Sequence, residues 1–175
     1  MSKAVLISIK PKWCEKIVNG NKTIEVRKTR PKLDTPFKCY IYCTLPKYPH
    51  EDFIATNYPR PQFYGGGKVI GEFTCDRIYE FEAKARGGSY YVKNEDQPTT
   101  NFIARQSCLD LKDMHDYLHA QTGYGWHITD LRIYDETREL SEFTGLRNTR
   151  FGAAPYDIKR APQSWGYVQE VACDE

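Results

Sequence analysis

Apolar residues at helical spacing follow a short apolar run near the start of the chain. The run itself, Ala4–Ile7, predicts a strand. Pro11 suits the first turn of a helix, where its missing N–H is not needed. Gly20 predicts the end of this helix, because glycine readily adopts the left-handed conformation that follows a last turn. The positions spaced for one buried stripe are Trp13, Cys14, Ile17 and Val18.

A period of two replaces the helical period from residue 23 onward, which predicts a strand over residues 23–27. Ile24 and Val26 fall on one face of this strand, and a core can bury that face. The opposite face presents the Glu25 carboxylate beside the Arg27 guanidinium. The pattern therefore predicts a strand with one buried apolar face and one charged face.

Four later stretches have the β-branched and aromatic content of strands, and one has helical spacing. The helix is predicted over Leu111–Leu118, with Asp110 as its N-cap and Gly123 as its stop. Gly71, in the middle of a strand pattern, indicates a bulge or a barrel corner. The further strands are predicted over residues 37–44, 68–79, 126–134 and 164–171.

Two tyrosines share the polar face of the strand predicted over residues 37–44. Alternation buries Phe37 and Ile41 and leaves Tyr40 and Tyr42 on the opposite face, so we expect both tyrosines to be exposed for contact. The stretches between the predicted elements are polar or rich in proline and glycine. They predict loops over residues 45–67, 82–106 (with room for a short strand), 138–146 and 147–160.

The pattern as a whole predicts an α+β fold. Five to six short strands interrupted by two helices favour a closed or nearly closed mixed β-barrel with flanking helices. The chain has 175 residues, enough for one core, and no repeat or linker divides it. We therefore expect residues 1–175 to form a single domain.

Charge is unevenly distributed along the chain. Hydrophobic residues make up 40% and charged residues 27%, which is typical of a globular protein, and the net charge is only +2. Affinity for a polyanion must therefore come from local clustering, since the whole chain is nearly neutral. A solvated basic face is the alternative to such a binding patch. The clustered cations are Lys10, Lys12, Lys16, Lys22, Arg27, Lys28, Arg30 and Lys32.

The six cysteines include no C-x-x-C pair, and we expect free thiols of a reducing compartment. Two spacings resemble zinc sites: Cys39 with Cys43, and His115 with His119. Same-face burial explains the first pair, and the second lacks the glutamate of an H-E-x-x-H pattern. We expect no metal and no cofactor. No apolar run approaches the roughly 18 residues of a membrane span, and no signal peptide is recognisable, so we expect a cytoplasmic protein without a membrane partner.

Three segments resemble the ASCH family. The stretch from Ser8 to Arg27 has the N-terminal helix and the G-x-K-x-x-E-x-R element, here Gly20, Lys22, Glu25 and Arg27, that mark this family. Residues 67–72 and 163–168 resemble it more weakly. The resemblance spans nearly the whole chain, with a dissimilar middle that suggests a variable insertion around residues 82–125.

Membership would imply a PUA-like β-barrel with a positively charged cleft for RNA, DNA or a modified nucleoside. The cleft-lining positions of the family correspond to Lys22, Glu25 and Arg27, which are the candidate catalytic residues. Amidohydrolase members have a threonine nucleophile where this chain has Glu25, so the acetylcytidine reaction of those members is in doubt here. Alternation along the strand does not settle whether Lys22 joins the charged face.

Further candidates come from the polar and aromatic residues near these segments. An aromatic platform of Trp126, Trp165 and the two tyrosines can stack bases, although Trp13 and Trp126 also suit a core. Candidate nucleic-acid contacts are Lys28, Arg30 and Lys32, which follow the charged strand. Candidate ligand contacts are Lys10, Tyr40, Tyr42, Gln163, Ser164 and Trp165.

Three functions fit these observations. The first is a monomeric ASCH-type domain that binds RNA or a modified nucleoside in a basic cleft. The second is a metal-independent hydrolase that uses the same cleft to cut RNA or an N-acyl nucleoside. The third is a protein-interaction module that retains the fold alone. Salt dependence of binding separates the first from the third, and turnover separates the first from the second.

Overall fold

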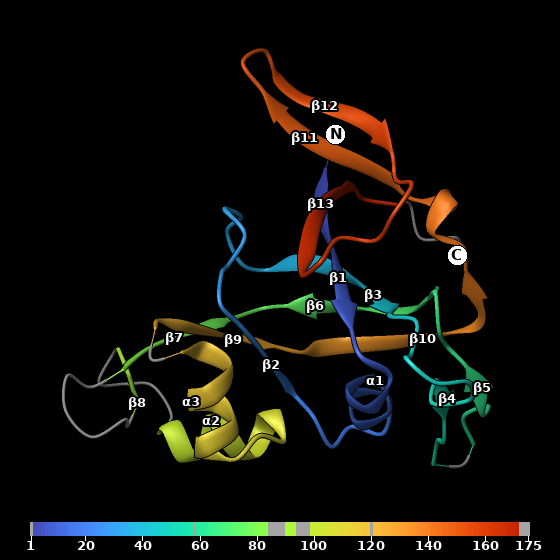
Figure 1. The fold of residues 1–175 in the computed structure, drawn as a ribbon. Coiled ribbons are helices and arrows are strands. Elements are labelled where there is room, and N and C mark those ends of the chain that lie inside the picture. The colour runs from blue at the N-terminus through green and yellow to red at the C-terminus, as the bar shows by residue number, and fades with distance from the viewer. Residues whose placement is uncertain (1, 58, 84–89, 94–98, 120, 172–175) are drawn as a thin grey trace.

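The computed structural model describes residues 2–57, 59–83, 90–93, 99–119 and 121–171. This part of the chain contains three α-helices and 13 strands, arranged as a sheet-dominated α+β fold (Figure 1). The prediction of an α+β fold is confirmed, whereas five to six strands was too few. The helices are α1 (Pro11–Val18), α2 (Thr100–Ser107) and α3 (Leu111–Leu118), and a 3-10 turn covers Leu140–Glu142.

Two sheets make up most of the molecule, and neither strand order closes on itself within the described residues. The larger sheet has seven strands in the order β10 (Thr129–Arg138), β6 (Lys68–Cys75), β3 (Phe37–Cys43), β1 (Lys3–Ile9), β13 (Trp165–Gln169), β11 (Thr144–Thr149) and β12 (Gly152–Asp157). The four-stranded sheet has the order β2 (Ile24–Arg27), β9 (Gly123–His127), β7 (Ile78–Ala83) and β8 (Tyr90–Val92). A third pair joins β4 (Phe53–Ile54) to β5 (Phe63–Tyr64). Among the described strand pairs, β1 and β3 alone run parallel, and the others are antiparallel.

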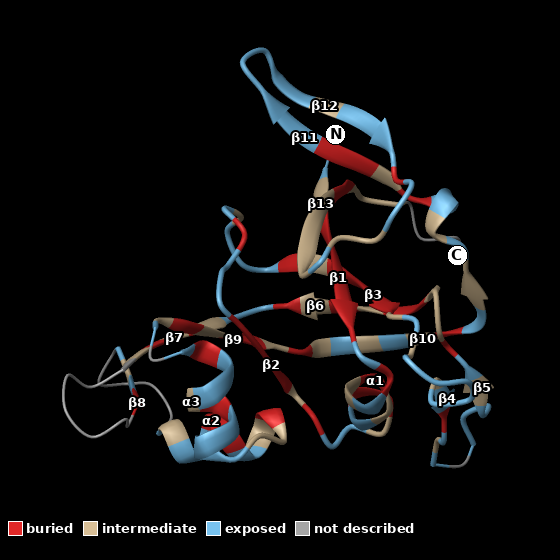
Figure 2. Ribbon diagram, in the orientation of Figure 1, coloured by how far each residue is buried: buried red, intermediate tan, exposed pale blue. Residues whose placement is uncertain are grey.

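Strand β1 divides the interior into two cores, and Figure 2 shows it buried along its length. Val5, Ile7 and Ile9 point into a core shared with α1 and with Trp126 of the smaller sheet. Ala4 and Leu6 point the other way, into a second core. Because successive side chains of a strand alternate between faces, a continuous apolar run suits this central position.

Helix α1 begins and ends where the sequence predicts. Pro11 occupies the first turn, and Gly20, with φ of 74°, follows the Asn19 cap in the left-handed region. The backbone N–H groups of residues 20–22 bond to the carbonyls of Ile17 and Lys16 at 2.9–3.1 Å. These bonds satisfy carbonyls of the last turn and reverse the chain sharply, so that Lys22 lies at the start of β2.

The expectation that Tyr40 and Tyr42 are exposed is wrong. Their relative exposures are 0% and 9%, and both belong to the second core. The second face of β3 is covered by residues from the C-terminal part of the chain, which alternation within β3 cannot reveal. The Tyr40 hydroxyl pairs with the backbone of Val171, accepting from its N–H at 2.8 Å.

Two stretches predicted as single strands are each divided between the two sheets. Residues 68–79 form β6 and then β7, and residues 126–134 fall in β9 and then β10. The crossings lie side by side, because His127 Nδ1 is 2.7 Å from Asp76 Oδ1 and the His127 N–H donates to the Arg77 carbonyl at 2.9 Å. Two consecutive polar residues, Asp76–Arg77 and Thr129–Asp130, shift the apolar alternation at or beside each crossing, a signal that the single-strand predictions passed over.

All four predicted loops contain regular structure. Strand β8 is the short strand allowed within residues 82–106, helix α2 begins in the same stretch, and the hairpin of β11 and β12 occupies much of 144–157. Short strands β4 and β5 interrupt residues 45–67. Helix α3 has the predicted Asp110 cap, whose carboxylate accepts from Asp113 N–H at 2.6 Å. It stops at His119 (φ 52°) before reaching Gly123, which belongs to β9.

Five described cysteines, Cys14, Cys39, Cys43, Cys75 and Cys108, are free thiols, and Cys173 lies outside the described residues. Burial is the main cause that raises the pKa of Cys14 and Cys39, and the same effect raises the pKa of Cys75 to about 12. These three thiols are therefore packing groups. Among the described helices, none combines the length and apolarity needed to cross a membrane.

The predicted irregularity at Gly71 is confirmed and gives a testable expectation. The register between β3 and β6 shifts at this point, and an added Cβ would overlap the carbonyl oxygen of Arg132. Because this carbonyl belongs to the backbone of β10, Gly71→Ala should destabilise the fold by about 1–3 kcal/mol. Urea unfolding measures the loss. Gly166→Ala is the control, since its nearest contact is an ordinary 3.6 Å, and equal stability of both variants would contradict the expectation.

Candidate functional site

Strand β2 carries the candidate site at an edge of the four-stranded sheet. Its register on β9 pairs Glu25 with Trp126 and Arg27 with Tyr124. Two backbone hydrogen bonds fix Thr23, which directly precedes the strand. Its N–H donates to the Gln106 carbonyl, and its carbonyl accepts from Ile128 N–H, each at 2.9 Å. Ile24 and Val26 bury their side chains with α2 and α3, which turns the charged face toward the other side.

Three charged side chains from this short stretch form one buried cluster. Lys22 Nζ lies 3.1 Å from Glu25 Oε2, and Arg27 Nη2 lies 3.0 Å from Glu25 Oε1. The relative exposures are 3%, 6% and 7% for Lys22, Glu25 and Arg27. Lys22 therefore does join the charged face, which alternation had left open. We refer to these residues as the Lys22–Glu25–Arg27 cluster.

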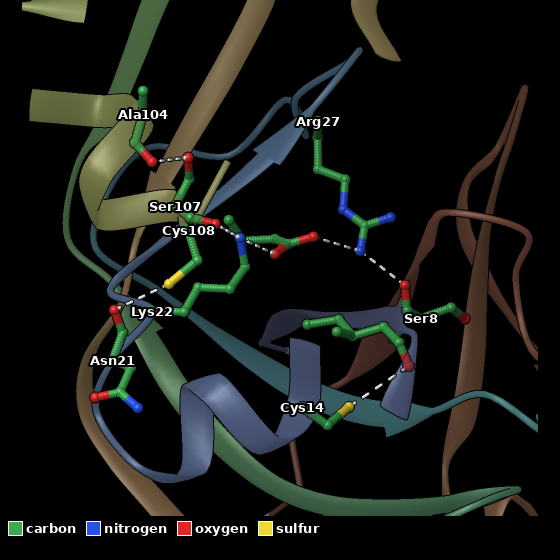
Figure 3. Close-up of polar contacts among 10 residues, drawn as sticks. Ser8, Cys14, Asn21, Lys22, Arg27, Ala104, Ser107 and Cys108 are labelled. Carbon is green, nitrogen blue, oxygen red and sulfur yellow. Dashed lines mark hydrogen bonds and ion pairs between the residues drawn. The ribbon is translucent and has the colours of Figure 1, made fainter. Parts of the chain in front are cut away.

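Backbone carbonyls from two other elements hold the cations in place. Lys22 Nζ donates to the Ser107 carbonyl at the end of α2 at 2.7 Å, and Arg27 Nη2 donates to the Ser8 carbonyl of β1 at 2.7 Å (Figure 3). Arg27 Nη1 also reaches Ser164 Oγ at 3.3 Å. Ser8 Oγ in turn donates to the Pro162 carbonyl at 2.6 Å. The cluster thus joins segments from the start, middle and end of the chain.

Two buried polar atoms of the cluster have no hydrogen-bond partner among the described residues. They are Glu25 Oε2, an acceptor, and Arg27 Nε, a donor. Glu25 Oε2 does have Lys22 Nζ within ion-pair distance, but that contact lacks the geometry of a hydrogen bond. Since more than about nine in ten buried polar groups are hydrogen-bonded, two such atoms together need an explanation.

The cluster lines a pocket of about 700 Å³. The walls come from the end of β1, from α1, from β2 and the residues after it, from the region of α3, and from the segment before β13. Helix α3 contributes Asp113 and Tyr117, and Leu109 precedes it. The cationic lining residues are Lys10, Lys12, Lys22, Arg27 and Lys28, against the two carboxylates of Glu25 and Asp113.

Two aromatic rings also line the pocket, and lysines lie over both. Trp13 has Lys12 Nζ 4.5 Å and Lys22 Nζ 5.1 Å from its ring centroid. Lys28 Nζ lies 5.2 Å from the Tyr117 centroid. Burial raises the pKa of the Tyr117 hydroxyl, so it stays protonated and can donate a hydrogen bond at neutral pH. The pocket lining therefore contains aromatic rings for planar groups and ammonium groups for anionic ones.

Of the predicted ligand contacts, Lys10, Gln163 and Ser164 line the pocket, and so does Lys28, which was predicted as a nucleic-acid contact. Tyr40 and Tyr42 are buried in the second core, away from these lining residues. The prediction that Tyr40 and Tyr42 join Trp126 and Trp165 in a base-stacking platform is therefore wrong. Trp126 is also fully buried, as the core alternative predicted.

Three other candidates lie outside the pocket lining. Trp165 packs on Trp126 with ring centroids 5.9 Å apart and donates from Nε1 to Thr29 Oγ1 at 3.0 Å. Arg30 and Lys32 are exposed. Arg30 donates to the carbonyls of Pro31 and Leu33, and the Lys32 N–H donates to the Tyr167 hydroxyl at 2.8 Å. These residues support the loop after β2 rather than the pocket floor.

Sequence reasoning missed the contribution of the chain around α3. Asp113 and Tyr117 are four residues apart, which places them on one helical face, while Met114 and Leu118 bury the face beside it. That spacing was visible, but nothing local indicated that this face meets β2. Trp13 was assigned to the core, yet it is half-buried and lines the pocket.

Potential metal ligands do not gather at this site. Within the described ranges, no group of three or more histidine, cysteine, aspartate or glutamate side chains could hold an ion. The Glu25 carboxylate is already shared by two cations, and Asp113 is the other carboxylate of the pocket. The arrangement is suited to binding through hydrogen bonds and charge.

Comparison with solved structures identifies the fold. A crystal structure of an ASCH protein from Zymomonas mobilis matches over 95% of this chain and 88% of its own, with a TM-score of 0.55 and 18% sequence identity. Two single-substitution variants of that protein match similarly, with TM-scores of 0.53 and 0.55 and identities of 16% and 17%. The chain has an ASCH-like fold. No protein-family model matches the sequence, and no curated protein matches it significantly, so the ASCH-like fold is recognised by its shape.

Removal of the shared carboxylate gives a stability prediction. Glu25→Ala leaves two buried cations without their common counter-ion, and the free energy of unfolding should fall by about 3–5 kcal/mol. Urea unfolding at neutral pH measures this. Lys112→Ala is the control, because it breaks an ion pair with Asp116 in which the lysine side chain is 82% exposed, and no change is expected. A Glu25→Ala variant as stable as its parent would show that the cluster is not electrostatically coupled.

Proposed function

We propose that this protein binds RNA or a modified nucleoside in the pocket above the Lys22–Glu25–Arg27 cluster. The observation that carries this proposal is that two buried polar atoms of pocket-lining residues, Glu25 Oε2 and Arg27 Nε, have no hydrogen-bond partner among the described residues. Leaving a buried polar group unpaired costs about 1–3 kcal/mol. A ligand that offers an acceptor to Arg27 and a donor to Glu25 recovers that energy only when it binds.

The chemistry of a nucleobase suits these two atoms. Base edges carry carbonyl or ring-nitrogen acceptors close to amino donors, and a guanidinium fork beside a carboxylate presents the complementary groups. Lys10, Lys12 and Lys28 add positive charge around the floor, which favours the phosphate or sugar oxygens attached to such a base.

The two rings of the pocket supply surfaces for stacking. Trp13 and Tyr117 line it from α1 and α3, and a base stacked on an aromatic ring gains about 1–3 kcal/mol. The volume of about 700 Å³ lies within the usual range of small-molecule sites, so one nucleoside or nucleotide unit is a suitable occupant. The ASCH-like fold supports the same placement by analogy.

The proposal also covers the domain boundaries. We propose that residues 1–175 form one ASCH domain of PUA-like type, monomeric and cytoplasmic. Residues 82–125 are its variable insertion, and they include α3. The insertion supplies Tyr117 and Asp113 to the pocket, so it would set ligand preference rather than merely extend the fold.

Hydrolysis of the bound ligand is the second candidate function, favoured by one specific contact. Lys22 Nζ lies 3.1 Å from the Glu25 carboxylate at the pocket floor. In this scheme Glu25 accepts a proton from an attacking water, and Lys22 stabilises the negative charge that develops on the substrate oxygen. Arg27 orients that oxygen through its fork. RNA and N-acylated nucleosides are the substrate classes.

Replacement of Glu25 by Gln separates the two functions. Glu25→Gln keeps the shape of the side chain and removes its charge and basicity. For a binding protein, affinity should fall at least about tenfold, because a charge-assisted hydrogen bond becomes a neutral one. For a hydrolase, turnover should collapse while binding persists. Calorimetry and product analysis on nucleosides, N-acylated nucleosides and short single-stranded RNA measure both.

The control for this experiment is Glu51→Gln, an exposed glutamate remote from the pocket lining. Thermal unfolding accompanies each variant. The proposal is contradicted if Glu25→Gln lowers the melting temperature but leaves both binding and turnover of the panel unchanged. The cluster would then be structural.

Salt dependence tests whether cations outside the pocket contact RNA. Arg30 and Lys32 are exposed after β2, and their joint replacement by Ala should weaken RNA binding across sequences. Each lost phosphate contact on a single strand should reduce the slope of log affinity against log salt by about 0.7. Titrations at several salt concentrations measure the slope. An unchanged slope would mean that both side chains only face solvent, while the pocket proposal would stand.

A further inference from the structure

The hairpin of β11 and β12 is mostly exposed to solvent. It extends away from the rest of the ribbon in Figure 1, and Figure 2 shows most of it exposed. Strand β12 forms the edge of the seven-stranded sheet and pairs only with β11 among the described strands. Pro155 lies in this edge strand, where it removes an N–H and discourages pairing with another sheet.

The tip of the hairpin presents a phenylalanine to solvent. Arg150 and Phe151 form the two-residue connection between Thr149 and Gly152, and Phe151 is 86% exposed. The tip is well held: Thr149 Oγ1 donates to the Gly152 carbonyl at 2.8 Å and accepts from Phe151 N–H at 3.2 Å. Gly152, at φ of 109°, provides the backbone freedom for the turn. A polar residue would serve this turn equally well, so folding gives no reason for the phenylalanine.

Arginine and aromatic side chains alternate along the arm. The Arg150 guanidinium carbon lies 4.6 Å from the Phe151 ring centroid. Register pairs Arg147 with Ala154 and Gly145 with Tyr156, so Arg147 and Tyr156 lie on the same face of the ribbon. Tyr156 covers Gly145 and remains 41% exposed.

The positive charge of the hairpin region indicates which class of partner it would bind. Residues 144–160 carry four cationic side chains against one carboxylate, a local net charge of +3, whereas the whole chain has +2. Planar guanidinium groups bind phosphate oxygens and stack on bases, and exposed rings stack on unpaired bases. A protein partner would require a larger apolar centre, and a membrane surface a continuous apolar face, than the ring of Phe151 provides.

We propose that the β11–β12 hairpin is a second nucleic-acid contact, distinct from the pocket. In it Phe151 stacks on a base of single-stranded RNA while Arg147 and Arg150 hold the adjoining phosphates. The proposal does not depend on the pocket ligand, because none of its residues lines the pocket.

The test uses the full chain and a labelled short single-stranded oligouridylate, with fluorescence anisotropy as the measurement. Phe151→Ala should weaken binding about fivefold or more, because the stacking surface is lost, and Phe151→Trp should restore it. The double variant Arg147→Ala, Arg150→Ala should flatten the salt slope by about 0.7 per lost phosphate contact. A blunt RNA duplex should bind more weakly than the single strand and show no Phe151 effect.

Matched controls exist on the other side of the molecule. Phe102→Ala removes a ring that is 44% exposed on α2, and Lys47→Ala with Arg105→Ala removes two exposed cations; both should leave oligouridylate binding unchanged. The proposal is overturned if Phe151→Ala binds like its parent. It is also overturned if hairpin variants change self-association or binding to anionic vesicles instead. The Phe151 defect should persist in a Glu25→Gln background, so failure of the pocket proposal and failure of this one are distinguishable.

Discussion

The Glu25 carboxylate lies between two buried cations, 3.1 Å from Lys22 Nζ and 3.0 Å from Arg27 Nη2, and this shared ion pair sets the geometry around it. Each cation is also anchored to a backbone carbonyl, Lys22 to Ser107 and Arg27 to Ser8. Strand β2 is thereby tied to α2 on one side and to β1 on the other. Burying three charges is expensive unless they are paired, so the pairing constrains how these segments can pack.

This constraint leaves two side-chain atoms of the cluster without hydrogen bonds. Carbonyls and counter-charges occupy the ends of Lys22 and Arg27, but Glu25 Oε2 and Arg27 Nε have no hydrogen-bond partner within the described chain. A cluster that served stability alone would be expected to satisfy them. Their residues line a pocket beside two aromatic rings, and for this reason we propose that the cluster binds a ligand.

The sequence predicted correctly the helix ends that depend on interactions between residues close together in the chain. Pro11 and Gly20 marked the ends of α1, and Asp110 marked the start of α3, because capping depends on nearby residues. Alternation likewise placed Glu25 beside Arg27. The family resemblance, not alternation, added Lys22 to this pair, and the structure brings the three charged residues of the G-x-K-x-x-E-x-R element together.

Long-range packing decided what the sequence did not reveal. Tyr40 and Tyr42 are buried by segments that are distant in the sequence. Alternation within β3 cannot show that residues from elsewhere in the chain cover its second face. The crossings between sheets near Asp76 and His127 are marked only by a one-residue shift of the apolar alternation, which does not reveal that the chain enters another sheet. The pocket wall from α3 was missed for the same reason, since Tyr117 reaches β2 only through tertiary packing.

We thus propose two nucleic-acid contacts, one in the pocket and one on the projecting hairpin. The pocket combines charged residues, two aromatic rings and two polar atoms without a hydrogen-bond partner among the described residues, whereas the hairpin presents rings and guanidinium groups to solvent. Their different geometries suit different parts of a ligand, a single base unit in the pocket and a strand along the arm.

The most direct measurement of the central claim is a crystal structure with the tightest-binding nucleoside or nucleotide of the panel. The account predicts the base within the pocket, with an acceptor at hydrogen-bond distance from Arg27 Nε and a donor at hydrogen-bond distance from Glu25 Oε2. A ligand bound elsewhere, with both atoms paired to other residues of the chain, would contradict it.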